Sequence, residues 1–144
     1  MADFMQLKNI VVATDFSTAS RKALQLASIL AHDSGAHLWI VHATEPRAAY
    51  TVGGVYASYP VGNELAQESE SLQKFVPEDP SIKYSQRLIM GEPAAQIVKF
   101  AADQQADLLV IGTHGRTGLT RLLLGSCAEQ ILRTASCPVI TLKG

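Results

Sequence analysis

Short apolar runs alternate with longer segments of helical periodicity along the chain. Residues 9–14, 37–43 and 108–112 are nearly continuous in β-branched and aliphatic side chains. Such runs are typical of parallel strands that are covered on both faces, whereas a half-exposed strand alternates polar and apolar positions. Residues 139–142 fit the same pattern, and residues 82–89 form a weaker run because polar side chains interrupt it. The pattern predicts five strands.

Between these runs, apolar residues recur at the spacing of amphipathic helices. Ser17 and Asn63 are typical N-cap residues, and Gly35 is a stop signal. Proline at a first helical turn costs no hydrogen bond. The expected helices are residues 17–34, residues 63–76, a segment opened by Glu92 and Pro93, and residues 126–134.

This alternation predicts an α/β fold with a single open five-stranded parallel sheet, Rossmann-like, with helices on both faces and right-handed crossovers. No internal repeat or low-complexity segment interrupts the pattern, so residues 1–144 are expected to form one domain. Ligands of such sheets bind beyond the carboxyl ends of the strands, where the strand order reverses. Residues 44–62 show no clear period and predict a lid, a binding loop or a mobile connection.

Composition narrows the classes of function. Of the 144 residues, 47% are hydrophobic and 17% are charged, which is too apolar for a disordered chain. The net charge of −1 argues against nucleic-acid binding through a broad basic field and against electrostatic attachment to a membrane. No apolar run approaches the ~20 residues of a membrane span, and the first residues contain no signal-peptide core. Cys127 and Cys137 form no CxxC pair and are expected to be reduced thiols of a cytoplasmic protein.

Two strand ends carry candidate chemistry. Residues 14–17 follow the first strand, and a glycine-rich segment, residues 112–118, follows the fourth and leads to Gly125 and Ser126 at a helix start. Glycines let main-chain N–H groups approach an anion, and a helix start adds its positive dipole end. The Ser126 hydroxyl is a further donor, and Arg116 or Arg121 adds guanidinium donors. This is the outline of a phosphate cradle, although it is neither a Walker loop nor a GxGxxG fingerprint.

The same features also have a structural interpretation. Glycines after a strand are ordinary turn residues, and Ser126 is also an N-cap residue type. Asp15 also suits a turn in which its carboxylate accepts hydrogen bonds from the local backbone. From spacing alone, both interpretations stay open.

The remaining polar residues give weaker signals. No two histidines have metal-ligand spacing. His42, at the end of an apolar strand, is expected to be a hydrogen-bonded core residue. Acyl hydrolysis has no nucleophile signature, because no GxSxG elbow is present. Cys127 and Cys137 lie in apolar stretches of sequence, where an inert thiol is the usual state.

The spacing Gly112-x2-Gly115-x9-Gly125-Ser126 resembles the nucleotide-binding signature of the universal stress protein family, in its ATP-binding branch. The resemblance covers nearly the whole chain, because further segments look like that family in the same order. They are residues 10–17, 38–43, 91–93, 106–112 and 137–140. The resemblance implies strand order 3-2-1-4-5, with the switch point between the first and fourth strands. It also implies a homodimer joined through the last strand.

The resemblance implies a ligand as well: ATP, or AMP or ADP, with Mg²⁺ carried by the nucleotide. By analogy, residues 13–15 line the adenosine side, main-chain groups near Ala43 meet the adenine, and residues 125–127 close on the phosphates. Cys127 replaces the aliphatic residue usual at its position, which matters little where a backbone N–H is the donor. The ligand-binding residues implied are Ala13, Thr14, Asp15, Ala43, Gly112, Thr113, His114, Gly115, Arg116, Gly125, Ser126 and Cys127.

The leading hypothesis is therefore a cytoplasmic universal stress protein that binds an adenine nucleotide as a stress-response sensor or regulatory module. The alternative is a slow ATPase or adenylate-processing enzyme on the same cradle. No second acid is paired with Asp15 and no lysine lies in the glycine segment, so no catalytic residue is assigned. A dimeric stress protein that uses no nucleotide is a third hypothesis, and the complete glycine signature counts against it.

Overall fold

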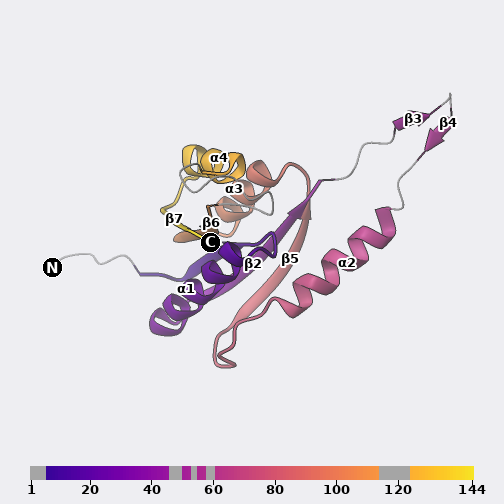
Figure 1. Ribbon diagram of the computed structural model, residues 1–144. Coiled ribbons are helices and arrows are strands. Elements are labelled where there is room, and N and C mark those ends of the chain that lie inside the picture. The colour runs from indigo at the N-terminus through magenta and orange to yellow at the C-terminus, as the bar shows by residue number, and fades with distance from the viewer. Residues whose placement is uncertain (1–5, 46–49, 53–54, 58–60, 114–123) are drawn as a thin grey trace.

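The computed structural model describes residues 6–45, 50–52, 55–57, 61–113 and 124–144. Within these residues, five parallel strands form one sheet in the order β5-β2-β1-β6-β7 (Figure 1). Along the chain this order is 3-2-1-4-5, which confirms the predicted sheet and its strand order. The strands are β1 (Asn9–Ala13), β2 (His37–Thr44), β5 (Tyr84–Met90), β6 (Leu108–Gly112) and β7 (Val139–Leu142).

Helices cover both faces of the sheet, as predicted (Figure 1). The central strand shows why its apolar run is continuous: Ile10 and Val12 pack with one set of helices, and Val11 and Ala13 pack with the other. One face carries α1 (Thr18–Ser34) and α2 (Val61–Lys74), and the other carries α3 (Pro93–Asp103) and α4 (Ser126–Thr134).

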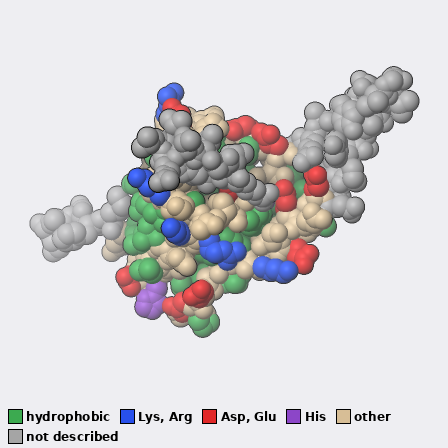
Figure 2. Space-filling model, in the orientation of Figure 1, with side chains coloured by type: hydrophobic (Ala, Val, Ile, Leu, Met, Phe, Trp, Pro, Cys, Tyr) green, Lys and Arg blue, Asp and Glu red, His purple; other side chains and the backbone are tan. Residues whose placement is uncertain are grey.

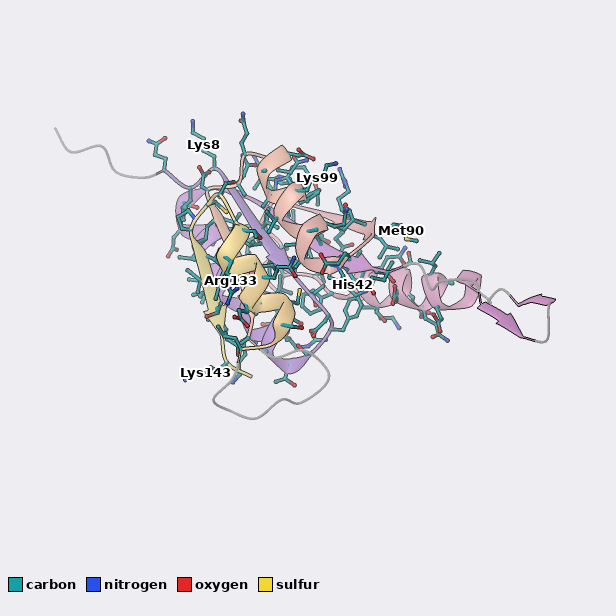
Figure 3. The ribbon with its side chains drawn as sticks, turned by 90° about the horizontal axis from the view of Figure 1, so that it is seen from above. Lys8, His42, Met90, Lys99, Arg133 and Lys143 are labelled. Atoms are coloured by element: carbon teal, nitrogen blue, oxygen red, sulfur yellow. The ribbon has the colours of Figure 1, made fainter. Side chains whose placement is uncertain are left out.

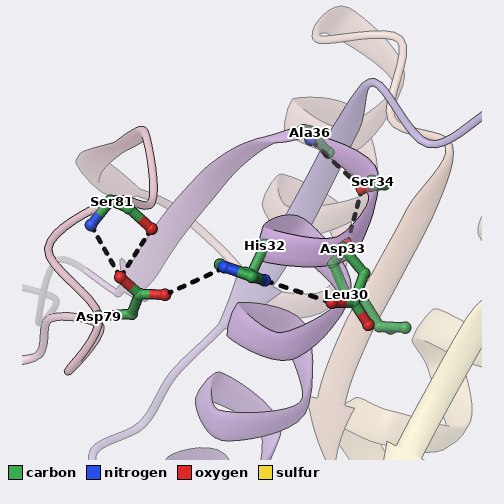
Figure 4. A network of polar contacts seen from close by, with 7 residues as sticks. All are labelled: Leu30, His32, Asp33, Ser34, Ala36, Asp79 and Ser81. Atoms are coloured by element: carbon green, nitrogen blue, oxygen red, sulfur yellow. Dashed lines mark hydrogen bonds and ion pairs between the residues drawn. The ribbon is translucent and has the colours of Figure 1, made fainter.

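The ends of α1 follow from its sequence. Ser17 is the N-cap, because its hydroxyl oxygen accepts a hydrogen bond from Ser20 N at 3.2 Å. Gly35 ends the helix with φ 74°, in the left-handed region that glycine adopts without steric cost. The last turn is then joined to the loop before β5, since His32 Nε2 lies 3.8 Å from Asp79 Oδ2 (Figure 4).

Three expectations about secondary structure were wrong. Helix α2 begins at Val61, so Asn63 lies inside it and is not its N-cap. Asparagine is a common N-cap residue, but that preference alone does not fix where a helix begins. Strand β5 begins at Tyr84, later than expected, because Ile82 packs into the core before the strand starts.

The third correction concerns residues 44–62, which are not wholly irregular. They contain a two-stranded antiparallel hairpin of β3 (Tyr50–Val52) and β4 (Val55–Ala57). Figure 1 shows these strands beyond the N-terminal end of α2, away from the main sheet. The five-stranded sheet is therefore built without them.

Figure 2 shows acidic and basic side chains interspersed on the visible face. Among the described residues, no helix combines the length and the apolar character needed to cross a membrane.

Candidate functional site

A cavity of about 220 Å³ lies beyond the carboxyl ends of β1 and β6. These strands are neighbours in the sheet, and the chain leaves them in opposite directions, so the cavity lies at the switch point. It brings together eight of the residues predicted to bind a ligand: Ala13, Thr14, Asp15, Ala43, Gly112, Thr113, Gly125 and Cys127. Ser126 lines an adjoining cavity, and His114, Gly115 and Arg116 lie outside the described residues.

The turn from β1 to α1 forms one wall of this cavity. Phe16 has φ 67°, a left-handed conformation that is uncommon for a bulky side chain. Hydrogen bonds hold this conformation in place: Thr14 Oγ1 accepts from Phe16 N at 2.8 Å, and Asp15 Oδ1 accepts from Ser17 N at 2.9 Å. Backbone strain that is held in this way clusters at ligand sites.

Asp15 therefore has the structural role that its sequence position allowed, because one carboxylate oxygen stabilises the turn. The same side chain is half-buried and lines the cavity. Thr14 is engaged more completely. Because the hydroxyl of Ser20 donates to Ser17 O at 2.9 Å, the hydroxyl of Thr14 is the donor in its 2.9 Å contact with Ser20.

Gly112 has a structural explanation that the glycine motif did not reveal. A Cβ at this position would lie 2.7 Å from the Cβ and 3.0 Å from the carbonyl carbon of Ala19, which no real contact tolerates. Helix α1 therefore demands glycine at the end of β6 whether or not a ligand is present. Gly112 still lines the cavity, but its lack of a side chain is not evidence for an anion.

Backbone hydrogen bonds join the residue after β6 to the N-cap of α4 and to the last strand. Gly125 N donates to Thr113 O at 2.8 Å, and Thr113 N donates to Leu142 O at 2.8 Å. The two bonds fix both ends of the glycine-rich segment beside the last strand. Gly125 is consequently buried and held at the cavity wall.

The first turn of α4 has no side-chain cap. Its N-cap is Gly125, so Ser126 is the first helical residue and not the cap that one interpretation of the sequence suggested. Among the described residues, none accepts a hydrogen bond from the backbone N–H groups of Ser126, Cys127 or Ala128. These donors and the positive end of the helix dipole together form the kind of site that binds anions.

Helix α3 offers a direct contrast, because its N-cap is a carboxylate. The side chain of Glu92 accepts from Ala94 N at 3.2 Å and from Ala95 N at 2.8 Å. This residue was read from the sequence only as the opening of a helix. In the structure it supplies the anion that α3 requires, and it lines the adjoining cavity.

Both cysteines are free thiols, and Cys127 is the one at the site. Partial burial raises the pKa of the Cys127 thiol, and the nearby carboxylates of Glu92 and Asp15 raise it further. The thiol is therefore protonated at neutral pH, in keeping with the expected inert state. The residue is exposed at the start of α4, and it also lines the cavity together with apolar residues such as Ile97 and Ile111.

His42 is a buried, hydrogen-bonded residue, as the sequence predicted. Its Nδ1 donates to Thr14 O at 2.7 Å, and its ring centroid lies 4.5 Å from that of Phe16. Figure 3 labels His42 among the side chains of the sheet and helices. Its Nε2 lies 3.6 Å from Oε2 of Glu68 on α2. Two features were not predicted from the sequence: His42 also lines the cavity, and the Glu68 carboxylate faces the His42 ring. No local signal joins them, because the two residues come from separate elements.

In the part of the chain that the structure describes, no three His, Cys, Asp or Glu side chains are grouped so that they could hold a metal ion.

The comparisons with known proteins agree with this fold. The model of the universal stress protein family matches residues 6–143. The chain belongs to the universal stress protein family. A universal stress protein of Methanocaldococcus jannaschii is 36% identical over 142 residues, which cover 94% of this chain and 82% of that protein.

Two similar solved structures contain adenine nucleotides. A universal stress protein of Archaeoglobus fulgidus, solved in complex with dAMP, is 26% identical with a TM-score of 0.71, covering 96% of this chain and 100% of the other. A universal stress protein solved in complex with cAMP is 25% identical with a TM-score of 0.64, covering 96% and 98% of the two chains.

Proposed function

We propose that this universal stress protein binds ATP, or the related AMP or ADP, as a cytoplasmic stress-response sensor or regulatory module. The observation that carries the proposal is the first turn of α4, which has no side-chain cap and opens on the switch-point cavity. A phosphate group there accepts from backbone N–H groups and lies at the positive end of the helix dipole. The relatives solved with dAMP and cAMP support an adenine nucleotide as the ligand.

The proposal also assigns roles to other residues that line the cavity. We expect Thr113 and Gly125 to lie on the phosphate side, and Asp15 and Ala13 to lie on the adenosine side. Main-chain groups near Ala43, which lines both cavities, are expected to meet the adenine. Mg²⁺ is expected to arrive on the nucleotide and to offset part of the phosphate charge.

Titration calorimetry with ATP and Mg²⁺ tests the proposal. We expect saturable binding at about one site per chain, because the described cavity is formed within a single copy. The absence of heat and of competition up to millimolar nucleotide would contradict it. Phosphate release measured in the same samples tests the rival enzyme hypothesis, which turnover on the usual scale of ~1–10³ s⁻¹ would favour.

We further propose that two copies pair through β7, which lies at the edge of the sheet. Pro138 O and Leu142 O both accept from residues that follow or belong to β6. Because peptide groups alternate along a strand, Val139 and Thr141 direct theirs to the open edge. An exposed edge of this kind pairs readily with another strand, and a two-fold axis closes the assembly at two.

Light scattering on Val139→Pro tests the pairing, since proline removes an outward donor without touching the bonds to β6. We expect a dimeric mass for the natural chain and a shift toward monomer in the variant. A mass near 15.5 kDa for both proteins at tens of micromolar would contradict the dimer. Ile140 is the wrong position for such a test, because its side chain packs against the core.

A further inference from the structure

Strand β5 forms the edge of the sheet opposite β7, and it is seven residues long. Leu38 N donates to Lys83 O at 2.9 Å, so Lys83 and the odd-numbered residues after it turn their peptide groups toward β2. The even-numbered residues from Tyr84 to Met90 turn theirs to the outer side. No backbone group among the described residues bonds them there. Such an edge is a template for a further strand.

The two faces of β5 are covered differently. On one face, Gln86 Nε2 donates to two carbonyl oxygens in and just after the last turn of α2, so this helix lies against the strand. On the other face, the exposed side chain of Arg87 lies over Trp39 of β2, with its guanidinium carbon 5.4 Å from the ring centroid. Helix α3 packs on the same ring through Phe100, at 5.8 Å between ring centroids. Because β5 is the outer strand, Arg87 forms the margin of this face.

Positive charge gathers on the face that carries Arg87. His37 Nε2 lies 2.9 Å from Ser85 Oγ, and its ring centroid lies 4.6 Å from that of Trp39. Burial lowers the pKa of His37 most, and the charges of Arg87 and Lys83 lower it further. Lys83, Ser85 and Arg87 alternate along the strand, so their side chains share one face. Two permanent positive charges therefore lie close together beside the edge.

Two carboxylates on the same side of the sheet have other partners. Asp103, at the end of α3, lies 3.8 Å from Lys99 Nζ. Asp107 accepts hydrogen bonds from two backbone N–H groups at the start of β1, at 2.8 and 3.0 Å. In the described part of the chain, neither Lys83 nor Arg87 forms an ion pair with a carboxylate. Their charges are therefore available to a partner.

These charges decide which strand the edge takes. A second copy paired antiparallel at β5 would bring the Lys83 and Arg87 side chains of both copies onto one face, where like charges repel. An acidic strand reverses the sign of that interaction. In an antiparallel pair its carboxylates lie opposite Lys83 and Arg87 at the non-hydrogen-bonded positions, where side chains are closest.

Arg87 is already placed for such a contact. Its Nη1 donates to Gln86 O at 2.8 Å, and this carbonyl belongs to the outer side of β5. The guanidinium therefore lies where an added strand runs. When a carboxylate arrives, the guanidinium exchanges this exposed bond for a charge-assisted one and frees Gln86 O for the new strand.

We propose that the outer edge of β5 binds an extended acidic segment of a partner protein as an added antiparallel strand, with its carboxylates paired to Lys83 and Arg87. Main-chain hydrogen bonds supply affinity in this mode of recognition, and alternate side chains supply specificity. The surface is separate from the switch-point cavity and from the edge of β7.

Trp39 is the chain's only tryptophan, so its fluorescence reports binding beside Arg87. The probe is the blocked peptide Thr-Glu-Val-Glu-Val-Glu-Thr, whose valines direct their peptide groups to β5 when its glutamates face Lys83 and Arg87. We expect saturable binding, at least about tenfold tighter than that of the same peptide with lysine in place of glutamate. Proline in place of both valines keeps the charge and removes the N–H donors, so this peptide should also bind at least about tenfold more weakly.

Each comparison can overturn the proposal on the natural chain, without any variant. Equal affinities for the acidic and basic peptides would show that charge does not select the strand. Equal affinities for the valine and proline peptides would show attraction between charges without an added strand. No binding of the acidic peptide up to millimolar concentration would also overturn the proposal.

Arg87→Glu then tests the assigned residue by reversing its charge. We expect affinity for the acidic peptide to fall at least about tenfold and affinity for the basic peptide to rise. Affinities are taken from titration midpoints, because the substitution also changes the surroundings of Trp39. Lys22→Glu is the matched control, since it makes the same charge change at an exposed position of α1, on the other face of the sheet. Equal changes in both variants, or none in Arg87→Glu, would overturn the assignment to Arg87.

Discussion

Helices α3 and α4 pack against each other on the same face of the sheet. Their N-termini differ, because a side chain caps the first turn of α3 and none caps the first turn of α4. The two oxygens of Glu92 satisfy N–H groups at the start of α3, and Gly125 leaves the start of α4 without a side-chain acceptor. Helix starts normally find an acceptor. Helix α3 thus supplies its own anion, and the contrast supports the proposal that α4 receives one from a ligand.

The glycines of the motif show the same distinction between structure and function. Gly112 is explained by its contact with Ala19, where any side chain would collide with α1. Gly125 has φ −60°, a conformation that every residue adopts, so its backbone does not demand glycine. What glycine provides at the start of α4 is the absence of a capping side chain. This position is therefore the most informative one to change.

The largest effect is expected from Gly125→Asp, which gives α4 the kind of cap that α3 already has. An aspartate at the N-cap accepts from the first-turn N–H groups and places a negative charge where phosphate binds. We expect nucleotide affinity to fall at least about 100-fold, since each tenfold loss requires only ~1.4 kcal/mol. Thermal stability should stay level or rise, by up to about 1 kcal/mol.

Calorimetry and thermal unfolding on the same samples check both halves of this prediction. Gly125→Ala is the control, because alanine has no acceptor and leaves the N–H groups open. Equal loss of affinity in the two variants would show that crowding, and not the cap, is responsible. Unchanged affinity in Gly125→Asp would mean that the start of α4 binds no anion.

Asp15→Asn is expected to have the next largest effect. Asparagine keeps the oxygen that accepts from Ser17 N, so the turn and the stability should change by less than about 0.5 kcal/mol. The lost charge should lower nucleotide affinity about tenfold, as for one charge-assisted hydrogen bond. A sharp fall in melting temperature with unchanged affinity would make Asp15 a structural residue alone. Asp15→Ala removes the turn contact as well and measures that part.

Glu92→Ala removes the capping carboxylate of α3, so that the first turns of α3 and α4 both lack a side-chain cap. Loss of an N-cap costs about 1 kcal/mol, which lowers the melting temperature of a chain of this size by about 4 °C. Affinity for nucleotide should be kept or slightly increased, since a negative charge near the start of α4 is removed. Loss of binding with normal stability would assign Glu92 to the ligand instead. Thermal unfolding and calorimetry give the two readouts.

The fold was largely predictable from the sequence because its buried strands are uninterrupted apolar runs. Both faces of β1 are buried, so its sequence is apolar without interruption, and the same is true of β6. The hairpin of β3 and β4 was missed although its signal was present: two runs rich in Tyr and Val flank Gly53 and Gly54. The absence of any period across the wider segment concealed this local pattern.

The candidate site was predictable only where it follows strand ends. Asp15 and Gly125 could be placed near the switch point once the family resemblance supplied the strand order, because that order brings the carboxyl ends of the first and fourth strands together. The contact between His42 and Glu68 could not, since it depends on how α2 lies on the sheet. The reason for glycine at position 112 was equally hidden, because the neighbour that excludes a side chain is on α1.

The smallest expected effect is on the alkylation rate of Cys127. It tests whether the charge of Glu92, the N-cap of α3, changes the pKa of a thiol at the start of α4. Burial, Glu92 and Asp15 raise the pKa of this thiol above its ordinary value of 9.0, so little thiolate is present at pH 8. Removing the charge of Glu92 lowers that pKa toward its ordinary value, and the thiolate fraction at a fixed pH rises. We expect Glu92→Gln to speed alkylation of Cys127 by iodoacetamide a few-fold.

Cys137 is the internal control, because burial and Asp107 raise its pKa without any contribution from Glu92. If mass spectrometry finds both cysteines accelerated alike, general loosening is the cause, and the charge of the α3 cap does not reach the start of α4.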